Sequence, residues 1–113
     1  MIDWARVKEL KEEMDTAFDE VVSLFLEETD ETMGRLPSAD DERPRDSAAL
    51  AADLHALKGA ALNLGLRDFA DLCSKGEAQS AAGAADEVDL AAITACYRAS
   101  RDAFTRGLNR DAA

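Results

Sequence analysis

Hydrophobic residues recur with helical spacing from the beginning of the chain. A first short stripe consists of Trp4, Val7, Leu10 and Met14. The longest stripe follows and consists of Phe18, Val21, Val22, Phe25, Thr29, Met33 and Leu36. Asp15 or Thr16 is a suitable N-cap for the second segment, because a short polar side chain there can accept a hydrogen bond from a free backbone N–H. The spacing fits either two helices or one bent helix.

The helical pattern breaks between residues 37 and 46, where the sequence reads PSADDERPRD. This stretch holds both prolines of the chain, several charges and no apolar period, which is typical of an exposed connection. We interpret it as a loop within one domain, because neither half of the chain could bury its stripe alone. Residues 1–113 are therefore predicted to form a single domain.

The pattern resumes with the spacing of a helix that faces a core. Its stripe consists of Leu50, Leu54, Leu57, Ala61 and Leu64. Asp46 and Ser47 are candidate N-caps for this helix, and Gly65 is suited to ending it.

Two further helices are predicted in the C-terminal half. The first carries Leu66, Phe69, Ala70 and Cys73, is weakened by Gly76 and ends around Gly83. The last carries Leu90, Ile93, Tyr97, Ser100, Phe104 and Leu108, has Asp86 as its candidate N-cap and frays over residues 109–113. No segment alternates like a strand, so the predicted fold class is all-α, an antiparallel four-helix bundle with a short additional N-terminal helix.

Composition narrows the possible partners. The chain has 24 acidic and 13 basic residues, a formal net charge of −11, which argues against nucleic acid or an anionic membrane as partner. No apolar run is long enough for a signal sequence or a membrane span, so a soluble cytoplasmic protein is expected. Cys73 and Cys96 lack CxxC spacing and a companion histidine, and we predict buried, reduced thiols.

The helix of residues 47–64 has a second face, roughly 120° around from its apolar stripe. This face carries Ala51, His55, Lys58, Gly59 and Leu62, and His55 is the only histidine of the chain. Gly59 is unexpected, because glycine in a helix interior costs about 1 kcal/mol relative to alanine. Lying one turn from His55, a residue without a side chain leaves the imidazole open to another molecule.

The neighbours of His55 decide which chemistry fits, because an isolated surface histidine is more often idle than functional. Positions one turn away, occupied by Ala51, Ala52, Lys58 and Gly59, offer no metal ligand and no carboxylate to orient the ring. An orienting group from another helix is left open. A nucleophilic histidine fits best, because the Lys58 ammonium disfavours a charged imidazolium and neutralises an incoming phosphoryl group. We also expect the lack of a nearby base to protect a phosphoramidate from water.

Residues 54–73, LHALKGAALNLGLRDFADLC, resemble the signature of the histidine-containing phosphotransfer (HPt) domains of two-component phosphorelays. The shared features are H-x-x-K-G, a glycine six residues beyond it, and an apolar helix that reaches Cys73. The preceding helix carries a Phe25-Leu26 pair, as in the family. The resemblance implies a phosphorelay intermediate that accepts a phosphoryl group on His55 from a receiver-domain aspartate and passes it to another response regulator.

The same resemblance implies roles for the neighbouring residues and for partners. Lys58 would stabilise the phosphoryl group, Gly59 would give access, and Glu77 on the facing helix would lie near the imidazole. The implied partners are the receiver domains of response regulators and hybrid histidine kinases, which would supply any Mg²⁺, so we expect no cofactor and no metal site in this chain. No P-loop or other ATP-binding motif is present, so a carrier is expected and not an enzyme with autokinase activity. The expected oligomeric state is a monomer.

An apolar patch beside His55 is a candidate docking surface for a receiver. Ala51 and Leu62, together with Glu77, are its candidate contacts, whereas core packing is the preferred interpretation for Phe18, Val22 and Leu26. Gly76 departs from the leucine usual in the family, which leaves the packing of its helix beside the site open. Two other functions are open as well: a helical adaptor that binds receivers without phosphoryl transfer, and a metal or haem bundle with His55 as a ligand.

Overall fold

The computed structural model describes residues 2–38 and 43–112. Its five α-helices in these ranges are α1 (Trp4–Met14), α2 (Phe18–Arg35), α3 (Ser47–Leu64), α4 (Arg67–Ala81) and α5 (Leu90–Ala112). Two short 3-10 turns, η1 (Asp15–Ala17) and η2 (Ala85–Glu87), stand before α2 and α5. The predicted all-α class is confirmed, and within the described ranges no helix is long and apolar enough to cross a membrane.

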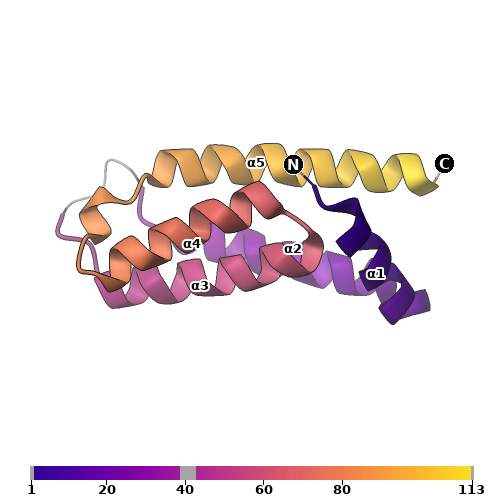
Figure 1. Ribbon diagram of the computed structural model, residues 1–113, viewed down its shortest axis with the longest axis horizontal. Coiled ribbons are helices and arrows are strands. Elements are labelled where there is room, and N and C mark those ends of the chain that lie inside the picture. The colour runs from indigo at the N-terminus through magenta and orange to yellow at the C-terminus, as the bar shows by residue number, and fades with distance from the viewer. Residues whose placement is uncertain (1, 39–42, 113) are drawn as a thin grey trace.

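The helices α2 to α5 alternate in direction and form an elongated bundle of 47 × 21 × 20 Å (Figure 1). The long helix α5 runs along one side, α3 and α4 form a hairpin below it, and α2 lies behind that hairpin (Figure 1). The short α1 packs at the end of the bundle where the α3–α4 turn lies (Figure 1). This arrangement confirms the predicted antiparallel four-helix bundle with a short leading helix.

The core is built around the apolar stripe of α3. Its five members are at most 3% exposed and are Leu50, Leu54, Leu57, Ala61 and Leu64. Phe69 from α4 and Phe104 from α5 are fully buried against the same core. Because the whole stripe is buried, the rotation of α3 about its own axis is fixed.

Both predicted ends of α3 are confirmed. Of the two candidates, Asp46 is the N-cap and Ser47 is the first residue of the helix; Asp46 Oδ1 accepts a hydrogen bond of 3.0 Å from the backbone N–H of Ala49. Gly65 is the C-cap and has a φ of 76°, the left-handed conformation that glycine adopts without strain. A Cβ at Gly65 would stand 2.6 Å from the carbonyl oxygen of Asp3, so glycine also admits the N-terminal segment, which packs against this turn.

The N-caps predicted for α2 and α5 are wrong. Asp15 and Thr16 lie inside the 3-10 turn η1, which separates α1 and α2 as two helices, and α2 begins without a side-chain cap. Asp86 lies in η2, where its Oδ1 accepts a hydrogen bond of 2.8 Å from the backbone N–H of Arg45. Asp89 caps α5 instead, accepting from the N–H of Ala92 at 3.0 Å.

Asp86 does not cap α5 because its carboxylate binds the backbone of Arg45. The Arg45 side chain is only 8% exposed, and its Nη1 donates to the carbonyl oxygens of Ala85 and Val88 at 3.1 and 2.9 Å. Arg45 therefore satisfies the carbonyls of the η2 turn while Asp86 satisfies the backbone of Arg45. These hydrogen bonds hold the segment before α3 against the segment before α5.

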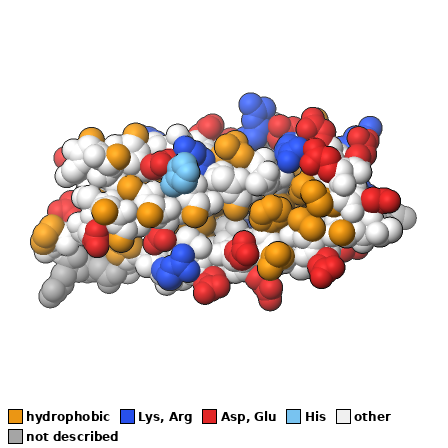
Figure 2. Space-filling view, turned by 90° about the horizontal axis from the view of Figure 1, so that it is seen from below, with side chains coloured by type: hydrophobic (Ala, Val, Ile, Leu, Met, Phe, Trp, Pro, Cys, Tyr) orange, Lys and Arg blue, Asp and Glu red, His pale blue; other side chains and the backbone are white. Residues whose placement is uncertain are grey.

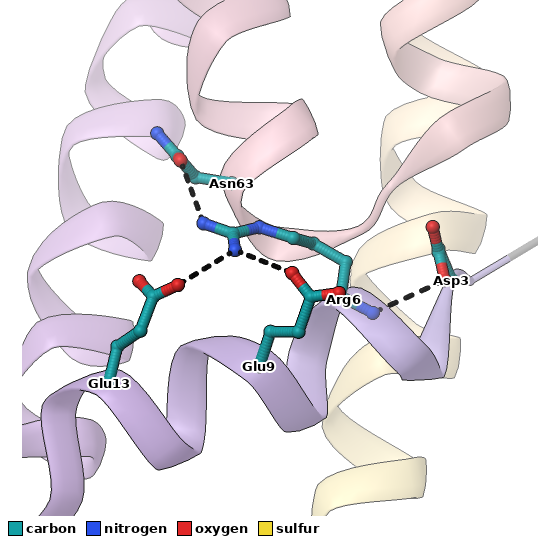
Figure 3. Close-up of polar contacts among 5 residues, drawn as sticks. All are labelled: Asp3, Arg6, Glu9, Glu13 and Asn63. Atoms are coloured by element: carbon teal, nitrogen blue, oxygen red, sulfur yellow. Dashed lines mark hydrogen bonds and ion pairs between the residues drawn. The ribbon is translucent and has the colours of Figure 1, made fainter.

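A second arginine fastens α1 to the end of α3. The Arg6 guanidinium donates to Glu9 and Glu13 on its own helix at 3.2 and 3.4 Å, and to Oδ1 of Asn63 on α3 at 3.4 Å (Figure 3). The backbone N–H of Arg6 is bound by the side chain of Asp3, the N-cap of α1, at 3.2 Å (Figure 3). These contacts are largely exposed, so they fix the orientation of α1 more than they add stability.

The cysteines do not form a disulfide. Cys73 is fully buried and Cys96 is half-buried, and both are free thiols. Burial raises the pKa of the Cys73 thiol to about 12, which keeps it protonated at neutral pH. The predicted reduced state is confirmed for both residues, whereas full burial holds only for Cys73.

Trp4 packs on α5 at a glycine. Its ring lies parallel to that of Phe104, with centroids 6.0 Å apart, and a Cβ on Gly107 would stand 2.0 Å from the indole. We therefore expect Gly107→Ala to displace the indole and to lower the free energy of unfolding by about 1–2 kcal/mol, although alanine is the better helix former. Chemical denaturation measures this loss, and emission from the only tryptophan of the chain should shift to the red.

Gly34→Ala is the matched control, because a Cβ there meets no atom within 4 Å. It should leave the emission unchanged and keep or slightly raise stability. A Gly107→Ala variant that behaves like the control would contradict the packing described for Trp4.

Candidate functional site

His55 projects from the helix whose opposite face is buried in the core. The Leu54 and Leu57 side chains on either side of it in sequence are 0% and 1% exposed, whereas the side chain of His55 is 69% exposed. Figure 2 shows this single histidine on the surface beside acidic and basic side chains. The buried stripe of α3 therefore presents the imidazole to solvent, as the helical spacing predicts.

One carboxylate from α4 joins His55 and Lys58. Glu77 Oε2 lies 2.8 Å from His55 Nδ1, and Glu77 Oε1 accepts a hydrogen bond of 2.9 Å from Lys58 Nζ. Glu77 and Lys58 are each about three-quarters buried, so this bridge lies at the edge of the α3–α4 interface, beneath the exposed ring. The predicted proximity of Glu77 to the imidazole is confirmed.

The bridge determines which nitrogen of His55 is nucleophilic. An ionised carboxylate only accepts hydrogen bonds, so Nδ1 of the neutral ring must carry the proton. The lone pair then resides on Nε2, which makes no hydrogen bond to any described residue. The ring is thus held in one tautomer, with its nucleophilic nitrogen pointing away from the carboxylate.

Hydrogen bonds from Lys58 and His55 keep the Glu77 carboxyl ionised, so that it can accept from both. The hydrogen bond from Lys58 lowers the pKa of the Glu77 carboxyl, and the hydrogen bond from His55 lowers it further. Glu77 is therefore an anion at neutral pH. The Glu77 carboxylate and the Lys58 ammonium carry opposite charges.

This geometry corrects one expectation from the sequence. The residues of α3 alone predicted no base near the ring, whereas the family resemblance placed Glu77 there, and Glu77 does contact Nδ1 directly. The reason is the α3–α4 hairpin: His55 lies 10 residues before Gly65 and Glu77 lies 12 residues after it, so the turn brings the two positions side by side. The similar separation of the two residues from the helix-ending Gly65 predicts the pair without reference to the family.

Gly59 leaves open space beside His55. It is exposed, and a Cβ at this position would meet no atom within 4 Å. Leu62, one turn further along, is 55% exposed, and Ala51 is half-buried. Phe18 and Val22 are buried in the core at 6% and 5% exposure, which confirms that they do not belong to the exposed surface beside the histidine.

Gly76 settles how α4 packs beside the site. It is buried, and a Cβ there would stand 2.9 Å from Leu54 Cδ1 and 3.2 Å from Val88 Cγ1. A larger residue would push α4 away from α3. The glycine therefore allows the close approach of the two helices that brings the next residue, Glu77, to His55.

No cluster that could bind a metal is present among the described residues. No group of three or more histidine, cysteine, aspartate or glutamate side chains converges there as metal ligands would. The carboxylate of Glu77, which contacts His55, is shared with Lys58.

Comparison with known families identifies the class of this chain. The model of the Hpt domain family matches residues 20–103, which is well over half of the sequence and includes the whole α3–α4 hairpin. The chain therefore belongs to the Hpt domain family. Hpt domains are helical phosphotransfer carriers without kinase modules that work with receiver domains in phosphorelays, so this protein takes part in histidine phosphotransfer. Searches among curated proteins and among solved structures gave no significant match.

Replacing either of two glycines near the site with alanine should change the free energy of unfolding, in opposite directions. Gly59→Ala should raise the free energy of unfolding by about 0.5–1 kcal/mol, because the helix gains propensity and nothing is displaced. Gly76→Ala should lower it by about 1 kcal/mol, because the methyl group collides with Leu54 and Val88. Urea unfolding of the two variants measures both changes, and a loss at Gly59 would show that this glycine serves the fold.

The charge of Glu77 gives a prediction about pH. Since the Lys58 hydrogen bond lowers the pKa of the Glu77 carboxyl, the bridge should persist at neutral pH and be lost only as the pH falls below the usual glutamate range. Titration of the Glu77 carboxyl by ¹³C NMR should show this low midpoint. Lys58→Met should move the midpoint upwards, and a midpoint that does not respond to this change would contradict the assignment of the hydrogen bond.

Proposed function

We propose that this protein is a phosphorelay intermediate that carries the phosphoryl group on Nε2 of His55. The observation that carries the proposal is the exposed imidazole whose Nδ1 is bound by Glu77, which leaves the Nε2 lone pair directed to solvent. A receiver-domain aspartyl phosphate presents an electrophilic phosphorus to such a nucleophile. The group then passes from His55 to a second response regulator.

The transfer step needs only groups that the two partners supply. The Nε2 lone pair attacks phosphorus, the P–O bond to the receiver aspartate breaks, and the aspartate leaves as a carboxylate. The proton on Nδ1 stays in its hydrogen bond to Glu77. Onward transfer reverses these events on another receiver. Any Mg²⁺ that neutralises the phosphoryl oxygens would be held by that receiver and not by this chain.

Lys58 and Gly59 assist the reaction from the same helix. Lys58 lies one turn from His55, and its ammonium can stabilise the phosphoryl oxygens. Gly59 leaves the space through which an aspartate reaches Nε2 in line with the bond that breaks. Ala51 and Leu62 belong to the surface on which the receiver docks, and Leu62 supplies exposed apolar area there.

The partners follow from this chemistry. The donors and acceptors are receiver domains of hybrid histidine kinases and of response regulators, and the reaction takes place in the cytoplasm, where these domains reside. A monomer suffices, because every residue of the site comes from one chain. A helical adaptor that binds receivers without transfer is the alternative that the following experiment separates.

Replacing the histidine tests the proposal. A panel of phosphorylated receiver domains should transfer an acid-labile, base-stable label to the wild-type protein and none to His55→Gln. The variant should keep its fold, with stability changed by no more than about 0.5 kcal/mol, because the ring is largely exposed. Thermal unfolding followed by circular dichroism is the control for folding.

Two results would contradict the proposal. Label on a folded His55→Gln variant would place the phosphoryl group elsewhere. Receivers that bind the wild-type protein but leave it unlabelled would identify it as an adaptor.

A further inference from the structure

We infer that Glu77 is a positioning residue that keeps the phosphohistidine labile, so that the carrier gives its phosphoryl group up readily. The inference deepens the proposed function and rests on it. The observation behind the inference is that a single carboxylate contacts both His55 Nδ1, at 2.8 Å, and Lys58 Nζ, at 2.9 Å. Each of these contacts opposes retention of a phosphoryl group on Nε2.

The contact with Lys58 creates a competition for one ammonium. Before phosphorylation the charges of Lys58 and Glu77 balance, and the ion pair is about three-quarters buried at both partners. A phosphoryl group adds nearly two negative charges beside the ring, and Lys58 is then the cation to which both anions are drawn. Glu77 therefore reduces the stabilisation that Lys58 can give to the phosphorylated state.

The contact with His55 acts on the leaving group. When the bond between nitrogen and phosphorus breaks, its electron pair returns to Nε2. The ring departs as neutral imidazole only if Nδ1 is protonated, and the negative charge of Glu77 favours the protonated, positively charged ring of the phosphohistidine. A neutral amide at this position would accept the same hydrogen bond without supplying that charge.

Both contacts of Glu77 favour loss of the phosphoryl group, whether it passes to a receiver or is hydrolysed. In onward transfer a receiver aspartate oxygen attacks phosphorus, a P–O bond forms and the N–P bond breaks. In hydrolysis a water oxygen takes the place of the aspartate and releases inorganic phosphate. Imidazole leaves in both reactions, so the lifetime of the phosphohistidine reports on the same lability that governs transfer.

The experiment compares the wild-type protein with Glu77→Gln after phosphorylation by phosphoramidate. In this reaction Nε2 forms the new bond to phosphorus and ammonia leaves, so no receiver is needed. Intact-mass spectrometry then follows loss of the phosphoryl group at constant pH. Glu77→Gln should retain it roughly threefold longer, the order of factor expected when one charge is removed from the opposite side of the imidazole ring in a largely aqueous setting.

Glu12→Gln is the matched control. It removes the same charge from an exposed position on α1, which contributes no residue to the site. Its phosphohistidine should decay at the wild-type rate. If both variants slow the decay equally, the net charge of the protein is responsible and the inference about Glu77 is overturned.

A spectroscopic readout separates the role of Glu77 from a merely structural one. In the wild-type protein the ¹⁵N signal of Lys58 Nζ should shift on phosphorylation, as the ammonium turns from Glu77 to the phosphoryl oxygens. In Glu77→Gln the starting signal should already differ, and the shift should be smaller. A Lys58 signal that phosphorylation leaves unchanged would overturn the competition between the two anions.

The outcomes test the role of Glu77 and the relay function of His55 separately. An equal or shorter lifetime in Glu77→Gln overturns the role of Glu77 while His55 still carries the group. Receivers that never label a protein which phosphoramidate does label overturn the relay function, and leave the lifetime comparison intact. A wild-type His55 that phosphoramidate fails to modify overturns both, because both require a nucleophilic Nε2.

Discussion

The structure depends on the burial of one face of α3. Leu54 and Leu57 are buried almost completely, which fixes the helix rotation and turns His55 outwards. The second constraint is Gly76, whose missing side chain lets α4 approach Leu54 closely enough for Glu77 to reach the imidazole. The site thus needs no loop to be formed: two rigid helices, joined by the turn at Gly65, place an imidazole, a carboxylate and a cation together.

The order of elements could be predicted because it is encoded locally. Apolar residues at helical spacing predicted every α-helix, and Asp46 and Gly65 marked the ends of α3, since a capping side chain and a left-handed glycine act on their own neighbours. The face that carries His55 followed from the same count of residues. Its membership in a phosphotransfer family was evident from the short motif around His55, and the family match over residues 20–103 confirms it.

The features that the sequence did not reveal arise from contacts between distant segments. Asp86 looked like a helix cap, yet the backbone of Arg45, 41 residues away in sequence, binds its carboxylate. Gly76 looked like a weakness in a helix and is instead a point of close packing. The resemblance placed Glu77 near the imidazole, but not its bridge to both Lys58 and His55, because hydrogen bonds across a helical hairpin depend on how the two helices pack and on side-chain rotamers.

The central claim is that Nε2 of His55 carries the phosphoryl group while Nδ1 remains protonated against Glu77. NMR of the phosphorylated protein labelled with ¹⁵N-histidine tests it most directly, because the chain contains a single imidazole. The account predicts that phosphorus couples to Nε2 and that Nδ1 keeps its proton in a hydrogen bond. Phosphorus coupled to Nδ1, or a phosphorylated protein whose imidazole signals do not change, would contradict it.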